Sequence, residues 1–326
     1  MKQVHFYTLK SAGGLKVEIS NLGAKITKLL IGGRDIVLGF KTADEWRTQE
    51  TYFNAICGRV ANRIKDGEYR IQNTEYRAPI NSGPNCLHGG MEGFNAKIWN
   101  VTAQSTYEIT LHYRAKDGEE GFPGNLDVWV TYTAMRDNTL QIHYEAKTDA
   151  PTIVALTNHA YFNLAGENSG RIDDHVLQVN ADRYSPQDEY TCPTGEIAPV
   201  EGTPMDFRLP TRIGDRLHDP FFAPWRGIDN NWCLCDANAP KVLRHAATLT
   251  ANGLTMQCWT TMKGLQVYTG NFIECHEGKS GTLYGPQHAV CLEAQNWPDA
   301  IHHADFPNIV LLPNERLDET TEYRFV

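Results

Sequence analysis

Two ionisable side chains stand out because each lies beside an apolar run in which a buried charge is unfavourable. Glu293 ends the run Ala-Val-Cys-Leu at residues 289–292, and His159 lies among apolar and aromatic neighbours in "VALTNHAYFNLAG". A charge in such surroundings is costly unless it is paired or used. Carboxylates and imidazoles are common general acids and bases. Together the two predict acid–base chemistry, although His159 alone is equally compatible with a satisfied core histidine.

Further polar side chains break the local pattern at four places, and all are of types that bind hydroxyl groups. Arginine brings five hydrogen-bond donors, and a histidine beside glycines lies where a backbone can approach a ligand closely. Structural roles stay open for each: a core ion pair, a solvated turn or a loop cap. The residues are Asn62 and Arg63 in "CGRVANRI", His88 in "NCLHGG", Asp229 in "WRGIDNNW" and Gln266 in "GLQVYTGNF".

Two tryptophans bracket one of these acids, since Trp225 and Trp232 flank Asp229. Aromatic faces pack on the C–H faces of sugars, while sugar hydroxyls need polar partners. The sequence has no zinc-type cysteine spacing, no phosphate-binding glycine loop and no Gly-x-Ser-x-Gly. We therefore expect acid–base chemistry on a neutral, polyhydroxylated ligand, with no metal.

The composition narrows the possible partners. The chain has 326 residues and a net charge of −9 without a Lys/Arg run, which argues against nucleic acid or an anionic membrane as a partner. No apolar run approaches the roughly 18 residues that cross a bilayer, and the start lacks the apolar stretch of a secretory signal. Eight scattered cysteines, with no Cys-x-x-Cys pair, indicate free thiols. We expect a cytoplasmic protein.

Alternating apolar and polar residues predict strands along most of the chain. Paired runs with turn residues between them occur at 14–33, 67–78, 98–115 and 125–148, and turn signals recur every 8 to 12 residues. Only "TADEWRTQ", residues 42–49, predicts a short helix. Residues 218–231, "HDPFFAPWRGIDNN", are expected to form a long ordered loop. These patterns predict one antiparallel all-β domain over residues 1–326, with function on loops and strand ends.

Several blocks, taken in order, resemble the aldose 1-epimerase (galactose mutarotase) family from about residue 21 to 325. They are "GRVANRI", "NCLHGG", "GFPGNLDVWVTY", "LTNHAYFNL", "VYTGNF" and "CLEAQNWPDA". The resemblance implies a large antiparallel β-sandwich, the supersandwich, with few short helices and an open cleft. It also implies interconversion of the α and β anomers of free aldohexoses such as galactose and glucose, without a cofactor. We expect an aldose as the ligand and a monomer or weak dimer.

The resemblance also assigns roles to individual residues. It implies Glu293 as catalytic base, His159 as catalytic acid, His88 as a second active-site histidine, and Asn62, Arg63, Asp229 and Gln266 as binders of sugar hydroxyls. The chain departs from the family at Asn230, where a histidine is common, and at Asn314, where a glycine is common. The departure at Asn230 bears on sugar preference or on the support of Asp229, whereas the departure at Asn314 is typical of loop variation.

The proton transfers set an expectation for the charges of the pair. Ring opening removes a proton from the C1 hydroxyl and adds one to the ring oxygen, so Glu293 must start ionised and His159 protonated. We expect partial burial to raise the pKa of Glu293 above its ordinary value of roughly 4.3, and the neighbouring carboxylate to hold the proton of His159.

Three alternatives remain open from the sequence alone. A hexose-6-phosphate 1-epimerase would need a basic pocket, whereas this chain is acidic. A non-catalytic sugar-binding module would have no use for Glu293 and His159 together. A glycosidase would use Glu293 and Asp229 as its pair of carboxyl groups.

Overall fold

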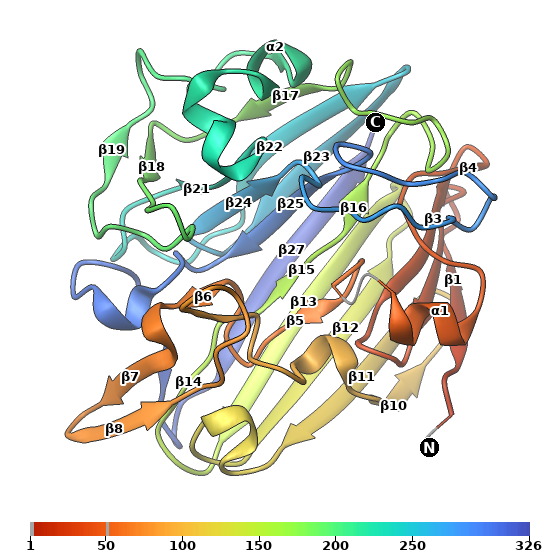
Figure 1. Cartoon of the computed structure of the whole chain (residues 1–326). Helices are drawn as coiled ribbons and strands as arrows, with labels where there is room; N and C mark the ends of the chain where they lie inside the picture. Colours follow the sequence, from red (N-terminus) through yellow and green to blue (C-terminus); the bar gives the residue numbers. More distant parts are fainter. Residues whose placement is uncertain (1–2, 50–51) are drawn as a thin grey trace.

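The computed structural model, which describes residues 3–49 and 52–326, is built mainly from antiparallel strands (Figure 1). Its largest sheet has nine strands in the order β10-β11-β12-β13-β27-β23-β22-β17-β20. Their bounds are β10 Asn100–Gln104, β11 Glu108–Ala115, β12 Leu126–Ala134, β13 Thr139–Thr148, β17 Val176–Val179, β20 Thr211–Arg212, β22 Arg244–Ala251, β23 Leu254–Thr260 and β27 Leu317–Phe325.

A six-stranded sheet and a four-stranded sheet complete the main layers. The six-stranded sheet has the order β16-β25-β24-β21-β18-β19, with bounds β16 Tyr161–Phe162, β18 Arg183–Ser185, β19 Ala198–Pro199, β21 Asp229–Cys233, β24 Gly264–Tyr268 and β25 Val290–Gln295. The four-stranded sheet runs β1 Phe6–Lys10, β2 Lys16–Ser20, β3 Ile26–Ile31 and β4 Arg34–Asp35.

Eight short strands form separate pairs at one end of the sandwich and along its cleft. The pairs are β5 Ile56–Cys57 with β15 Thr157–Asn158, β6 Arg63–Ile64 with β9 Cys86–Leu87, β7 Glu68–Ile71 with β8 Thr74–Arg77, and β14 Thr152–Ile153 with β26 Val310–Leu311. Apart from the four-residue ladder of β7 and β8, these ladders have two residues and carry few hydrogen bonds, so the segments depend on side-chain contacts for their position.

Helices are short, and no helix in the described part of the chain is long and apolar enough to cross a membrane. The α-helices are α1 Ala43–Thr48 and α2 Gly214–Leu217; the 3₁₀ turns are η1 Lys65–Gly67, η2 Phe94–Ala96, η3 Glu119–Gly121, η4 Pro220–Trp225 and η5 Ala300–His302. The helix expected at residues 42–49 is confirmed, and a capping box of Thr42 and Glu45 starts it.

The expectation of a loop over residues 218–231 is wrong. Asp219 accepts a hydrogen bond from the Phe221 N–H and Pro220 occupies the first turn, so η4 forms there. Strand β21 then begins at Asp229. The aromatic and proline content of the segment concealed a capped turn followed by a buried strand.

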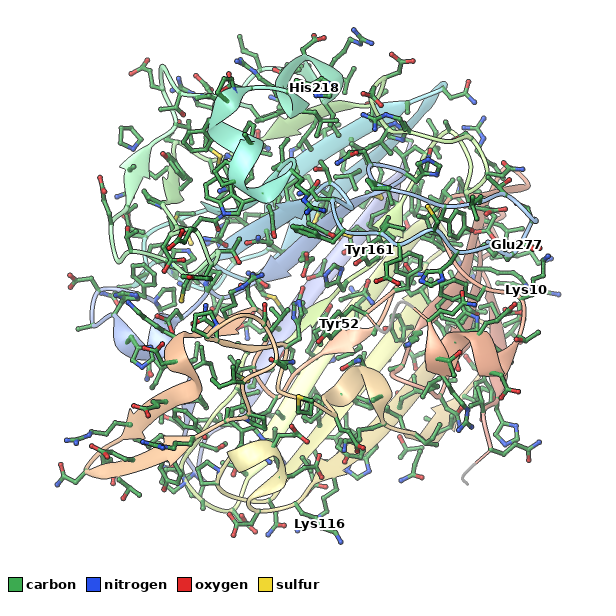
Figure 2. All side chains as sticks on the ribbon, in the orientation of Figure 1. Lys10, Tyr52, Lys116, Tyr161, His218 and Glu277 are labelled. Atoms are coloured by element: carbon green, nitrogen blue, oxygen red, sulfur yellow. The ribbon has the colours of Figure 1, made fainter. Side chains whose placement is uncertain are left out.

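The two large sheets share one apolar core, which confirms the all-β prediction. Strand β12 alternates buried and partly buried side chains, as a strand with one covered face does. By contrast β21 and β25 are buried on both faces. Charged side chains such as Lys10, Lys116 and Glu277 lie at the periphery, whereas Tyr52 and Tyr161 lie near the centre of the view (Figure 2).

Candidate active site

Three adjacent strands of the six-stranded sheet form the floor of a cleft. Gln266 of β24 is directly opposite Glu293 of β25 and Asn231 of β21. Because side chains alternate along a strand, Asp229, two residues before Asn231, lies on the same face. The intervening residues, such as Leu265 and Leu292, belong to the apolar core. The sheet therefore turns its polar face towards the cleft.

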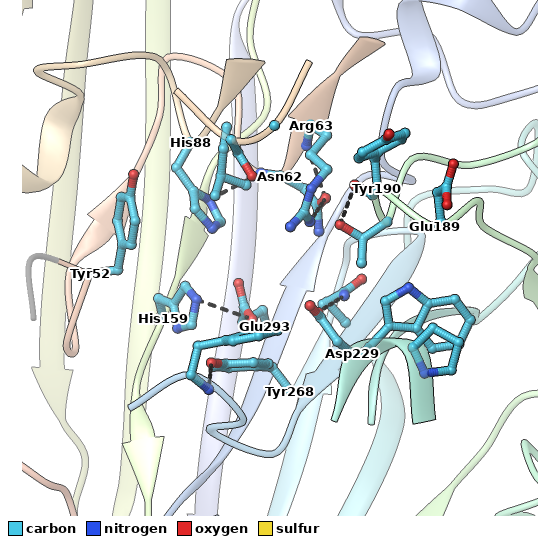
Figure 3. Close-up of a pocket in the computed structure, with 18 of the residues that line it drawn as sticks. Tyr52, Asn62, Arg63, His88, His159, Glu189, Tyr190, Asp229, Tyr268 and Glu293 are labelled. Atoms are coloured by element: carbon cyan, nitrogen blue, oxygen red, sulfur yellow. Dashed lines mark hydrogen bonds and ion pairs between the residues drawn. The ribbon is translucent and has the colours of Figure 1, made fainter. Parts of the chain in front are cut away.

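Loops and short strands supply the walls. His159 directly follows β15, Arg63 begins β6, and His88 directly follows β9. Figure 3 shows Tyr52, His88 and His159 at one end of the cleft and Glu189 and Tyr190 at the other, with Glu293 and Arg63 between. Residues far apart in the chain thus converge on one space.

The structure brings all seven residues that the sequence singled out to the lining of a cavity of about 470 Å³. They are Asn62, Arg63, His88, His159, Asp229, Gln266 and Glu293. Trp225 also lines this cavity, but Trp232 points into the apolar core against Phe207. The expectation that both tryptophans face a ligand is therefore wrong for Trp232, because alternation along β21 places it opposite to Asp229.

Sequence reasoning missed several lining residues, most of them aromatic or on loops. Tyr161, Tyr268 and Phe272 lay inside blocks that were recognised, yet nothing local marked them as lining a cleft. Tyr52 gave no signal, and Glu189, Tyr190 and Thr191 carried no local mark of a cleft, since loop residues have no periodic pattern. The complete set adds Ser82, Gly83, Leu87 and Pro224.

Glu293 and His159 are neighbours in the floor and wall of the cleft. The His159 Nε2 and Glu293 Oε1 atoms lie 3.5 Å apart (Figure 3), and the two side chains are 6% and 2% exposed. In the described part of the chain, Glu293 Oε2 and His159 Nδ1 are buried without a hydrogen-bond partner. Such a pair is placed to give and take protons.

Burial shifts the two pKa values in opposite directions. It raises the pKa of Glu293 well above the ordinary value, and the Asp229 carboxyl adds to the rise while Arg63 opposes it. It lowers the pKa of His159 to about 3. The expected rise for Glu293 is confirmed; the expectation that the carboxylate holds a proton on His159 is wrong, because desolvation of the imidazolium dominates.

The proton count of the pair is nevertheless suited to the chemistry. When both groups are neutral, the pair holds one titratable proton, which lies on Glu293. When Glu293 is ionised and His159 is protonated, the pair also holds one titratable proton, which lies on His159. A shift of that proton across 3.5 Å therefore converts one arrangement into the other without exchange with solvent. Between them the two groups hold one acid and one base.

A backbone hydrogen bond fixes the protonation of His88. The Asn62 N–H donates to His88 Nδ1 at 3.1 Å, so in the neutral ring the hydrogen must lie on Nε2. Burial lowers the pKa of His88 well below its ordinary value, and His159 and Arg63 add to this. His88 therefore offers a neutral Nε2–H donor beside the acid–base pair.

Ligand atoms of His88, His159 and Glu293 lie within 4.8 Å of one another, a spacing that a metal ion could bridge. Metal ligation through His88 Nε2 would require the ring hydrogen on Nδ1. Nδ1 already faces the Asn62 N–H. With a hydrogen on Nδ1, the Nδ1–H and the Asn62 N–H would be two hydrogen-bond donors pointing at each other. The donor set does not fit a metal.

Hydrogen bonds among the remaining polar groups orient them towards the cavity. The Gln266 Nε2 donates to Asp229 Oδ1 at 2.7 Å, and the Arg63 backbone N–H donates to Asn62 Oδ1 at 2.9 Å. Burial raises the pKa of Asp229, while Arg63 and the Gln266 hydrogen bond oppose the rise. These groups present both donors and acceptors, as a ring of hydroxyls requires.

The departure at Asn230 lies outside the cavity lining. Alternation along β21 turns its side chain away from the face that carries Asp229. The residue is fully buried, and its Oδ1 accepts a hydrogen bond from the Asp229 N–H at 3.3 Å. An influence of Asn230 on the site would therefore pass through the backbone of Asp229.

Comparison with known proteins agrees with this geometry. The family model "Aldose 1-epimerase" matches residues 5–324. A galactose mutarotase of Mus musculus is 43% identical over 320 residues, which cover 95% of this chain and 91% of that protein.

Solved structures give the same result. An aldose epimerase homologue from C. elegans is 29% identical with a TM-score of 0.90, covering 99% of both chains. A galactose 1-epimerase from Lactobacillus acidophilus is 29% identical with a TM-score of 0.86, covering 100% of this chain and 99% of that one. This chain belongs to the aldose 1-epimerase family.

Proposed function

We propose that the protein is an aldose 1-epimerase that interconverts the α and β anomers of free aldohexoses such as galactose and glucose, without a cofactor. The observation that carries the proposal is the buried pair of Glu293 and His159, 3.5 Å apart, in a cavity lined by hydroxyl-binding groups. Membership of the aldose 1-epimerase family supports the same activity.

In the proposed reaction Glu293 and His159 exchange roles. The proton of the pair first moves to His159. Ionised Glu293 then takes the proton of the C1 hydroxyl while His159 protonates the ring oxygen, and the bond between C1 and the ring oxygen breaks. The aldehyde turns about its C1–C2 bond, and the reverse transfers close the ring on the other carbonyl face. Each well-placed transfer contributes roughly 10²- to 10⁴-fold.

The other cavity residues hold the sugar in this proposal. The His88 Nε2–H donates to an oxygen at the reacting end, because it lies beside the pair. Asn62, Arg63, Asp229 and Gln266 bind the hydroxyls. Tyr52, whose ring lies 4.8 Å from that of His88, and Trp225 pack against the sugar ring.

The lining disfavours a phosphorylated substrate. Arg63 is the single Lys or Arg among the described residues that line the cavity, and phosphate sites usually gather several cations. The pair of Glu293 and His159 also disfavours a non-catalytic sugar-binding module, which would have no use for a neighbouring acid and base. A glycosidase that uses Glu293 and Asp229 remains the alternative to exclude by assay.

Polarimetry on fresh α-anomers tests the proposal. We expect the protein to accelerate the approach of α-galactose and α-glucose to anomeric equilibrium, to act weakly on 6-phosphorylated glucose and to release no sugar from a glycoside. An unchanged polarimetric rate with the free sugars would refute the function.

Cellular location and assembly belong to the same proposal. All eight cysteines are free, which supports a reducing compartment, and we expect a cytoplasmic protein that acts as a monomer or weak dimer. Gel filtration with light scattering measures the oligomeric state.

A further inference from the structure

Arg63 depends on a weakly anchored strand for its place in the cleft. Strand β6 has two residues and pairs only Arg63 with Leu87 and Ile64 with Cys86. The residue before it, Asn62, has a φ of 62°. This left-handed backbone conformation costs free energy for residues other than glycine. A strand of this length needs other contacts to hold it.

Asp299 supplies such contacts on both sides of Ile64. Its backbone N–H donates to the Arg63 carbonyl at 3.1 Å, and its Oδ1 accepts from the Lys65 N–H at 2.9 Å. The Asp299 side chain is fully buried, and its φ of 54° is left-handed. A buried acid in an unfavourable conformation, bonded twice to the backbone beside Arg63, points to a specific task.

The same residue connects Arg63 to the catalytic strand. Asp299 follows Glu293 by six positions and directly precedes the 3₁₀ turn η5 as its N-cap residue. Its carboxyl is held from the other side by His302, whose Nδ1 lies 2.7 Å from Oδ1, while His303 Nε2 lies 3.4 Å from Oδ2 without a hydrogen bond. The hydrogen bond that His302 donates to the Asp299 carboxylate raises the pKa of His302, which favours the charged form of this histidine.

We propose that Asp299 is a positioning residue that clamps the backbone on both sides of Ile64 and thereby sets where Arg63 meets the sugar. This inference rests on the proposed function. Asp299 is not among the residues that line the cavity, so it acts through Arg63 and affects binding of the sugar more than the proton transfers.

Two variants remove the side-chain half of the clamp, the hydrogen bond between Lys65 and Asp299, in different ways. Asp299→Ala deletes the acceptor, whereas Lys65→Pro deletes the N–H that donates to it, together with the exposed lysine side chain, and leaves the acid in place. Lys65 is exposed and begins the 3₁₀ turn η1, a position that tolerates proline. Lys65→Pro therefore keeps the test available if Asp299→Ala does not fold. We expect either change to raise KM for galactose about tenfold and to alter kcat less than about twofold.

Asp299→Asn and Asp149→Ala serve as controls. The side-chain oxygen of asparagine can still accept from Lys65, so Asp299→Asn should recover most of the KM. Asp149 accepts from the N–H and the side-chain amide of Asn125 at 2.8 and 2.7 Å and does not line the cavity. Asp149→Ala removes two hydrogen bonds of an exposed acid and should leave KM unchanged.

A double-mutant cycle with Arg63→Ala identifies the route of the effect. If Asp299 acts through Arg63, adding Lys65→Pro to Arg63→Ala raises KM by less than about twofold, because the interaction is already lost. A full further rise in that background, or an unchanged KM in the single variants with an active wild type, would overturn the proposal. An inactive wild type would instead refute the proposed function.

Discussion

Replacing Glu293 by glutamine removes the proposed base while keeping the shape of the side chain. The carboxyl is 2% exposed and lies 3.5 Å from His159. Loss of one general base costs roughly 10²- to 10⁴-fold in rate, or about 2.7 to 5.4 kcal/mol of transition-state stabilisation. We expect kcat in polarimetry with α-galactose to fall by that factor and KM to change less than about threefold.

The same variant has a defined effect on stability. Burial raises the pKa of Glu293 above the unfolded value near 4.5, so the folded protein holds this proton more tightly than the unfolded chain. Stability is therefore lost as the pH rises from the unfolded towards the folded value. Glutamine has no such proton, and we expect the Tm of Glu293→Gln at pH 7 to equal or exceed that of the wild type.

Two results would refute this reasoning. A kcat within about threefold of the wild type would exclude Glu293 as the base. A clearly lower Tm at pH 7 would show that the ionised carboxyl stabilises the fold, contrary to the direction of its pKa shift. Circular dichroism spectra of both proteins provide the control for folding.

Three further predictions follow from the site. His159→Gln should lower kcat roughly 10²- to 10⁴-fold with a small change in KM; a normal kcat in polarimetry would exclude His159 as the acid. Arg63→Ala should raise KM roughly 10- to 100-fold, as loss of charged hydrogen bonds does, and an unchanged KM would remove Arg63 from sugar binding. The pair holds one proton from the pKa of His159, about 3, up to the raised pKa of Glu293. The ratio kcat/KM should therefore show no fall as the pH is lowered through roughly 4.3, the ordinary pKa of glutamic acid, and an acid limb at that pH would contradict the shifts.

The sequence predicted the strands whose two faces differ. In β12 and β13 alternating apolar residues mark a covered face, and both strands pair in the register that a hairpin requires. Strand β27 was not predicted, although it lies between β13 and β23 in the nine-stranded sheet. Its sequence, "LDETTEYRF", is polar over most of its length, and burial comes from the neighbouring strands.

The candidate site was predicted where a polar residue interrupts an apolar pattern. Glu293 and His159 were recognisable for this reason, as were Asn62, Arg63, His88, Asp229 and Gln266, and the resemblance to the family added their individual roles. Local sequence could not show that burial lowers the pKa of His159, because that effect depends on the enclosure formed by residues far away in the chain, such as Tyr52 and Tyr268. The clamp at Asp299 was equally hidden, since it consists of hydrogen bonds to a segment more than 200 residues away.

The central claim is that Glu293 and His159 are the two ends of one proton relay, and the double variant Glu293→Gln/His159→Gln tests it most directly. Groups that act as a unit show strongly non-additive losses. The account predicts that kcat of the double variant equals that of the weaker single variant within about threefold. Losses that multiply across the two sites would show that the residues act independently and would contradict the relay.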